Sequence, residues 1–152
     1  MKAGELCNRE VVTTTPDMSI QEAARLMRDN HVGCLIVVKE HDGQVEPAGI
    51  LTDRDIVIEL IAKDVPIEDV SVGDVMSFAV LKVTEAETVF ATAQRMRSRG
   101  VRRVPVVSTT GALVGVLALD DILSLLGEEL SLLAKLTRRE AEQETKKRNL
   151  PW

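Results

Sequence analysis

Apolar residues recur with a helical period at two places in the chain. The first place holds Ile20, Ala23, Ala24 and Met27, which fall at positions i, i+3, i+4 and i+7. This spacing predicts a helix with one buried face. Ser19, with Glu22 three residues later, forms a capping-box pattern that marks where the helix begins. The second place carries the matching set Val89, Ala93 and Met96, and Gly100 predicts a left-handed helix end.

Each predicted helix is followed by two short apolar runs that are typical of strands. The runs cover residues 35–38, 48–51, 104–107 and 113–117. Asp42-Gly43 and Thr110-Gly111 predict the turns that join them. An extended segment at residues 11–13 precedes the first helix. A further helix is expected to begin near Asp53 in the first half of the chain and near Asp120 in the second.

The two halves form an internal repeat. Residues 27–32 resemble residues 96–101, an offset of 96 − 27 = 69, and residues 49–51 resemble residues 115–117, an offset of 115 − 49 = 66. The length difference falls in the turn between matched strands, where a duplication tolerates it. The predicted fold is therefore α/β (α+β), with two tandem β-α-β-β-α repeats whose small sheets are flanked by helices. The repeats cover residues 1–65 and 66–127, and a helical tail covers 128–152.

Composition narrows the possible functions. The net charge is −5, aromatic residues make up 2% of the chain, and there is no Tyr. Nucleic-acid binders usually present a basic face and often aromatic stacking platforms, so we expect no nucleic-acid partner. No apolar run reaches the roughly 18 residues of a membrane helix. The first residues lack the apolar core of a signal peptide and only two cysteines are present, so the expected location is the cytoplasm.

Residues that could bind a ligand lie where the strand at residues 48–51 passes into the helix near Asp53. First-turn N–H groups and the Thr52 hydroxyl can hold a phosphate at such a junction. The Asp55 carboxylate can accept hydrogen bonds from ribose hydroxyls. The alternative interpretation is that Thr52 or Asp53 only caps the helix.

Taken together, these features resemble a tandem pair of CBS domains, the Bateman module. Both copies carry Gly-apolar-apolar-x-x-x-Asp before the last helix, at residues 49–55 and 115–121. Val-Gly-Asp-Val-Met at 72–76 and Val-Arg-Arg-Val-Pro-Val-Val at 101–107 are also typical. The resemblance covers about residues 3 to 127. It implies a stand-alone regulatory module, not an enzyme, that needs no cofactor, binds AMP, ADP or ATP between its copies and signals to an unknown effector protein by a change of shape.

The resemblance also implies which residues bind. Thr52 and Asp55 match the Thr-x-x-Asp that binds phosphate and ribose, and Arg102 and Arg103 match basic residues that reach the phosphates. The adenine-holding segment, main chain with apolar side chains, is expected near Val12 and Thr13.

Arg54 lies in the first turn of the helix that begins near Asp53 and can face either a phosphate or solvent. The same two positions are open to Lys82, beside the extended segment that enters the second copy. A second cleft would combine Asp121 with the residues Ala118, Gly33 and Cys34. Because it lacks the hydroxyl and both arginines, we expect it to be empty or to prefer a nucleoside.

Other interpretations stay open. The ligand can instead be S-adenosylmethionine or NAD(H), or the chain can be a ligand-free structural or dimerisation module. An enzyme would have only Asp55 and Asp121 as candidate bases. A metal site is not expected, because neither histidine has a partner at metal-ligand spacing. Cys34 begins an apolar strand and is predicted to be a small core residue.

The resemblance implies a homodimer that pairs through helices. The leucine stripe at residues 123, 126, 130, 133 and 136 supports this, because such a surface is usually buried on a partner. From Arg138 to Arg148 the chain is almost entirely polar, which predicts a solvated helix or a frayed end.

Overall fold

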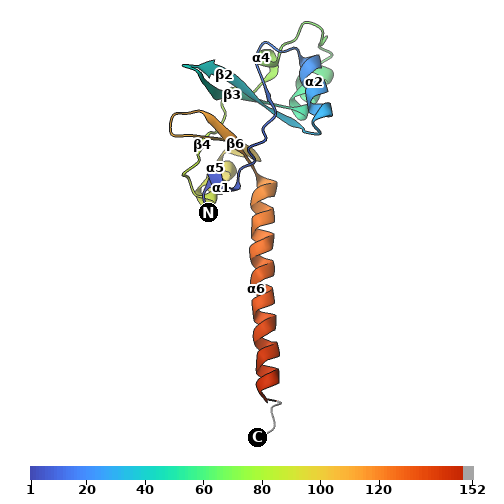
Figure 1. Ribbon diagram of the computed structural model, residues 1–152. Helices are drawn as coiled ribbons and strands as arrows, with labels where there is room; N and C mark the ends of the chain where they lie inside the picture. Colours follow the sequence, from blue (N-terminus) through green and yellow to red (C-terminus); the bar gives the residue numbers. More distant parts are fainter. Residues whose placement is uncertain (149–152) are drawn as a thin grey trace.

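The computed structural model describes residues 1–148 and contains two three-stranded sheets. The first sheet holds β1 (Thr13–Thr14), β2 (Cys34–His41) and β3 (Gln44–Thr52), and the second holds β4 (Val83–Thr84), β5 (Arg103–Val107) and β6 (Leu113–Ala118). In each sheet the first strand runs parallel to the second, and the second runs antiparallel to the third. The predicted mixed α/β fold with two copies is confirmed (Figure 1).

The helices are α1 (Ala3–Leu6), α2 (Ile20–Asp29), α3 (Asp53–Ile56) with a π-helical turn (Val57–Ile61), α4 (Val72–Val75), α5 (Val89–Arg99) and α6 (Leu119–Arg148). The helices predicted after Ser19, up to Gly100, near Asp53 and near Asp120 are present as α2, α5, α3 and α6, whereas the short helices α1 and α4 were not predicted. The Ser19–Glu22 capping box is present, and Gly100 ends α5 in the left-handed conformation at φ 66°. The prediction for Ala24 is wrong, because α2 buries only a narrow face through Ile20, Ala23 and Met27 and leaves Ala24 exposed.

The two copies exchange short segments. Ala3 and Cys7, on and just after α1, belong to the apolar core of the second copy. Val72 and Met76, on and just after α4, belong to the core of the first copy. A backbone hydrogen bond of 2.7 Å from the N–H of Ala3 to the carbonyl of Glu87 anchors α1 there. Each packed unit is therefore completed by residues from outside its own sequence repeat.

The matched glycines of the two copies lie where the exchanged segments cross a strand. A Cβ atom on Gly115 would lie 2.6 Å from the carbonyl oxygen of Asn8, and one on Gly49 would lie 2.8 Å from the Met76 sulfur. Beside Gly115, Asn8 and Val116 exchange two backbone hydrogen bonds of 2.9 Å each. The repeat keeps glycine at these positions because a side chain would push the crossing segment away from the strand.

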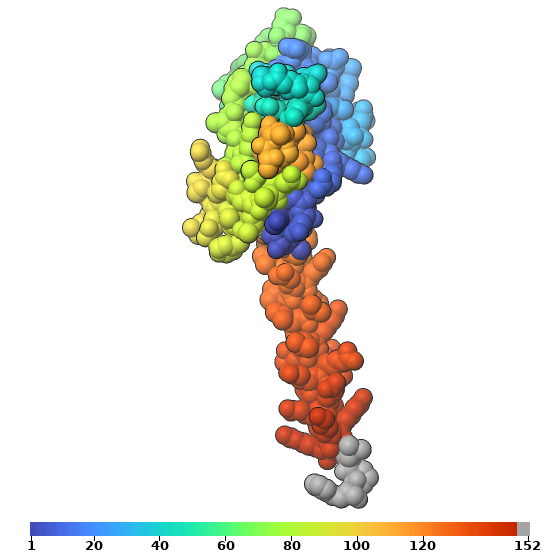
Figure 2. Space-filling view, turned by 60° about the vertical axis from the view of Figure 1, so that its left-hand side comes forward, coloured from blue at the N-terminus to red at the C-terminus, as the bar shows by residue number. Residues whose placement is uncertain are grey.

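Helix α6 continues past the second copy as one 30-residue helix. It stands out from the body in both overall views (Figures 1 and 2). The predicted C-terminal helix is confirmed as far as Arg148, and residues 149–152 of that prediction lie outside the described residues. Among the helices of residues 1–148, none is both long and apolar enough to cross a membrane.

Candidate functional site

A cavity of about 500 Å³ lies between the two copies, and we call it the larger cavity. Its walls bring together Thr52, Arg54 and Asp55 of the first copy with Arg102 and Arg103 of the second. All five are predicted from the sequence as binding residues, and the fold brings them to one place. The volume falls within the roughly 300–1,000 Å³ typical of small-molecule sites.

Thr52 and Asp55 hold each other in place at the end of β3. The Thr52 hydroxyl oxygen accepts a hydrogen bond from the Asp55 N–H at 3.1 Å, and the Thr52 N–H donates to the Asp55 carboxylate at 2.9 Å. The capping interpretation of this pair is therefore correct. Within residues 1–148 neither the Thr52 hydroxyl proton nor the second Asp55 carboxylate oxygen has a protein partner, so both can still contact a ligand.

The first-turn N–H groups of α3 are not free to bind a phosphate, which corrects the sequence prediction. The N–H of Asp53 donates to the carbonyl of Gly33 at 3.0 Å, and the N–H of Arg54 donates to the Asp53 carboxylate at 2.8 Å. The N–H of Asp55 already donates to Thr52. An anion in this cavity would therefore be bound by side chains.

Basic side chains supply the positive charge for anion binding that the first turn of α3 does not. The walls of the larger cavity contain three arginines, Arg54, Arg102 and Arg103, and two aspartates, Asp53 and Asp55. The excess of positive charge favours an anionic ligand. Arg102 has a weak partner of its own, because its guanidinium lies 3.7 Å from a carboxylate oxygen of Asp120 and both side chains are largely exposed.

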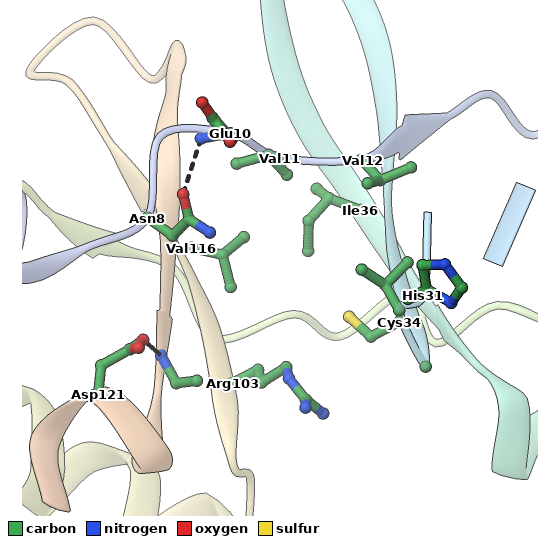
Figure 3. A pocket seen from close by; sticks show the side chains of 13 residues that line it. Asn8, Glu10, Val11, Val12, His31, Cys34, Ile36, Arg103, Val116 and Asp121 are labelled. Carbon is green, nitrogen blue, oxygen red and sulfur yellow. Dashed lines mark hydrogen bonds between the residues drawn. The ribbon is translucent and has the colours of Figure 1, made fainter. Parts of the chain in front are cut away.

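A smaller cavity of about 270 Å³ is the counterpart of the larger one in the repeat (Figure 3). Asp121 takes the position of Asp55 and accepts a hydrogen bond from the Ala118 N–H at 2.8 Å. Ala118 replaces the threonine, so the hydroxyl is missing. Gly33 and Cys34 stand 69 residues before Arg102 and Arg103, in the matching positions.

The charge of the smaller cavity differs from that of the larger. Its walls contain the carboxylates of Glu10 and Asp121 and one guanidinium, that of Arg103, which lines both cavities. The smaller cavity is therefore poor in positive charge and unsuited to a phosphate.

The structure does not bring Val12 and Thr13 to the larger cavity. Val12 lines the smaller cavity, and Thr13, on the edge strand β1, pairs with Ile36 of β2. The corresponding segment of the larger cavity is 79–81, which lies 69 residues after 10–12. The cause is the crossing of the lead-in segments, since the one before β1 passes beside the junction of the second copy. Lys82 does not line the larger cavity either, and its carbonyl accepts a hydrogen bond from Arg95 at 3.0 Å.

Cys34 is not the core residue that the sequence predicts. It is half-buried at the start of β2 and lines both cavities. Burial raises the pKa of its thiol above the ordinary value of 9.0, while the nearby Arg103 acts in the opposite direction. In the described part of the chain, no cluster of three or more His, Cys, Asp or Glu side chains could hold a metal ion.

Comparison with known proteins gives a consistent result. The family model described as "CBS domain" matches twice, at residues 3–62 and 72–128. The chain is 34% identical over 113 residues to the CBS domain-containing protein YhcV of Bacillus subtilis, which covers 74% of this chain and 76% of that protein. The chain is also 35% identical over 123 residues to the uncharacterized protein MK0525 of Methanopyrus kandleri. This match covers 81% of this chain but only 61% of that protein.

The fold is also similar to a solved structure. The CBS domain pair of protein MJ0100, in complex with 5′-methylthioadenosine and S-adenosyl-L-methionine, is 26% identical to this chain with a TM-score of 0.73. The match covers 85% of this chain and 98% of that one.

Proposed function

The chain belongs to the CBS-domain family, with two CBS domains in tandem, and on this premise we propose that it is a regulatory module that binds an adenine nucleotide in the larger cavity. The module is not an enzyme in this proposal. It transmits occupancy of the cavity to an effector protein. A ligand does this only as far as it binds one shape of the module better than another.

The observation that carries the proposal is the meeting of three arginines with the Thr52–Asp55 pair across the two copies. In this assignment the arginines and the Thr52 hydroxyl donate to phosphate oxygens. The free carboxylate oxygen of Asp55 accepts from the ribose. Residues 79–81, with their apolar side chains, lie against the adenine.

The charge of the larger cavity favours AMP, ADP or ATP over other adenosine compounds. 5′-Methylthioadenosine has no charge, and S-adenosylmethionine carries one carboxylate together with cationic groups. Each charge-assisted hydrogen bond contributes about 1.5–3 kcal/mol, so three guanidinium groups separate these ligands by their number of negative oxygens. The MJ0100 pair holds the two sulfur-containing compounds, so both belong in the test.

The smaller cavity takes an uncharged nucleoside or nothing in this proposal. Asp121 supplies an acceptor for ribose hydroxyls there, while Glu10 adds a second negative charge. We also propose that the module works as a homodimer, since exposed apolar residues on α6 are otherwise left in water.

Isothermal titration calorimetry and thermal unfolding test the proposal with AMP, ATP, S-adenosylmethionine, 5′-methylthioadenosine and NAD. AMP or ATP should bind with one dominant site per chain. A ligand at 100 times its Kd should stabilise the fold by about 2.7 kcal/mol, which raises Tm by several degrees.

Matched variants locate the site. Arg102→Ala with Arg103→Ala should abolish tight nucleotide binding, whereas Arg99→Ala, which removes an exposed arginine outside the cavity walls, should not. Absence of binding and of any Tm shift at millimolar nucleotide would reject the proposal in favour of a structural module. Tighter binding of S-adenosylmethionine than of AMP would show that the adenine nucleotide is not the preferred ligand.

A further inference from the structure

Helix α6 exposes a regular row of leucines that the body of the protein does not cover. Of its 30 residues only Ile122 is buried. The row is formed by four leucine residues that are 47–67% exposed: Leu123, Leu126, Leu130 and Leu133. It crosses the end of the family match at residue 128, so half of it lies on a segment beyond the CBS domains. A helix of this length extends about 45 Å, and most of it has no protein neighbour in Figures 1 and 2.

The spacing of the row identifies what covers it. Successive leucines are three, four and three residues apart. A mean spacing of 3.5 residues keeps a row of side chains facing a second helix that winds around the first. An identical helix offers an identical row at the same spacing. This pattern is self-complementary and favours a second copy of the chain over an unrelated partner.

We propose that α6 pairs with α6 of a second copy as a parallel two-stranded coiled coil, with these four leucines in the seam. The proposal specifies the interface of the homodimer proposed above and rests on it. Charges beside the seam permit this pairing. Among the flanking positions from 127 to 136 only Glu129 is charged, and in a parallel pair it faces Ala134 of the other helix, so no like charges meet.

The seam ends after Leu136. Continuing the same spacing puts Thr137, Glu140, Glu144 and Lys147 in the row. In a parallel pair each would face its own copy, and glutamate against glutamate or lysine against lysine is repulsive. The helices therefore separate beyond about residue 137, and the paired part spans two heptads.

The position of the leucines sets the orientation. An antiparallel pair that matched all four leucines would be centred on residue 128, since (123 + 133)/2 = 128. Residue 137 of one helix would then lie opposite Leu119, the first residue of the other. The following 11 residues, roughly 16 Å of helix, would run into the body of the partner. A parallel pair avoids this collision, because both bodies lie at the same end.

A pair of lysine variants tests the seam. Leu130→Lys puts a charge into it, whereas Leu132→Lys makes the same change at a residue that is 69% exposed and points away from it. Sedimentation of the full chain should report twice 16.7 kDa for the wild type and for Leu132→Lys. Leu130→Lys should weaken the dimer at least about tenfold, because a buried leucine is lost from both helices. Circular dichroism confirms that each variant is folded.

Cross-linking tests the orientation. In a Cys34→Ser background, Leu130→Cys should form an interchain disulfide on mild oxidation, because residue 130 meets its own copy only in the parallel pair. Glu128→Cys, on the outward side of the helix, should not. A wild-type dimer that Leu130→Lys and Leu132→Lys affect equally would overturn the seam and leave the homodimer standing. A wild-type monomer would overturn both, while nucleotide binding is judged separately by calorimetry. A dimer in which Leu130→Cys forms no interchain disulfide would overturn the parallel orientation.

Discussion

Asp55 and Asp121 hold the same position in the two copies, and a matched pair of alanine variants separates structural from binding roles. Each carboxylate accepts a hydrogen bond from the N–H three residues earlier, at 2.9 Å from Thr52 and 2.8 Å from Ala118. Such a bond to a charged group contributes about 1.5–3 kcal/mol, and in a chain of this size each kcal/mol shifts Tm by about 2–4 °C. Asp55→Ala and Asp121→Ala should therefore lower Tm by similar amounts, roughly 3–12 °C.

Their effects on nucleotide binding should differ. Only Asp55 lines the larger cavity, where its free oxygen accepts from the ribose in our proposal. Losing a hydrogen bond to a charged group costs about 1.5–3 kcal/mol, which weakens binding about 10- to 150-fold. Calorimetric titration with AMP should show this loss for Asp55→Ala and an almost unchanged main site for Asp121→Ala. Equal losses in both variants, or a loss only in Asp121→Ala, would refute the assignment of the two cavities.

Three further predictions concern Asp120, the end of α6 and Cys34. Asp120→Asn removes the carboxylate 3.7 Å from Arg102, so AMP should bind about two- to fivefold tighter while adenosine is unaffected; equal AMP affinity in calorimetry would refute this competition. Truncation after Leu136 removes residues 137–152, of which 137–148 are exposed, so Tm measured by scanning calorimetry should change by less than about 2 °C. A larger fall in Tm would mean that this segment packs against the rest of the protein. Because burial raises the pKa of the Cys34 thiol, a maleimide at pH 8 should label it more slowly than free cysteine, with Cys34→Ser as control; equal rates would contradict the assignment.

Local rules in the sequence predicted the longer helices and the paired strands, but not the short helices α1 and α4. The capping box at Ser19 and the left-handed Gly100 depend on residues within one turn of each other, so a sequence pattern records them. The Asp42-Gly43 turn has positive φ at both residues, as the predicted hairpin requires. The π-helical turn after α3 was not predicted, because nothing in the apolar spacing of Val57–Ile61 distinguishes it from an α-helix.

The exchange of α1 and α4 could not be predicted, because it depends on tertiary packing. The repeat offset makes the two segments equivalent but does not say which copy each one packs on. A signal was present in the matched glycines Gly49 and Gly115, which stand inside apolar strands where a glycine often marks the close approach of another segment. The same exchange explains the error at Val12 and Thr13, since the lead-in of each copy passes beside the junction of the other.

Ligand binding and helix pairing should be coupled, because the larger cavity and the seam of α6 meet at Arg102. Its carbonyl accepts the N–H of Leu119, the first residue of α6, at 2.8 Å, and its side chain contacts Asp120. A phosphate that draws the guanidinium away from Asp120 acts one turn before Leu123, where the seam begins.

The size of this coupling can be measured from either side. Coupling is reciprocal, so if AMP changes dimer affinity by some factor, dimerisation changes AMP affinity by the same factor. At a concentration at which Leu130→Lys is monomeric and Leu132→Lys is dimeric, the two variants should therefore differ in AMP affinity. The difference should be about two- to fivefold, since the contact that changes is an exposed ion pair. Adding Asp120→Asn to both variants should remove the difference, because the contact is then absent in monomer and dimer alike. Equal AMP affinities in the two parent variants would show that the cavity and the seam act independently, and the signal to an effector would then have to leave the module by another surface.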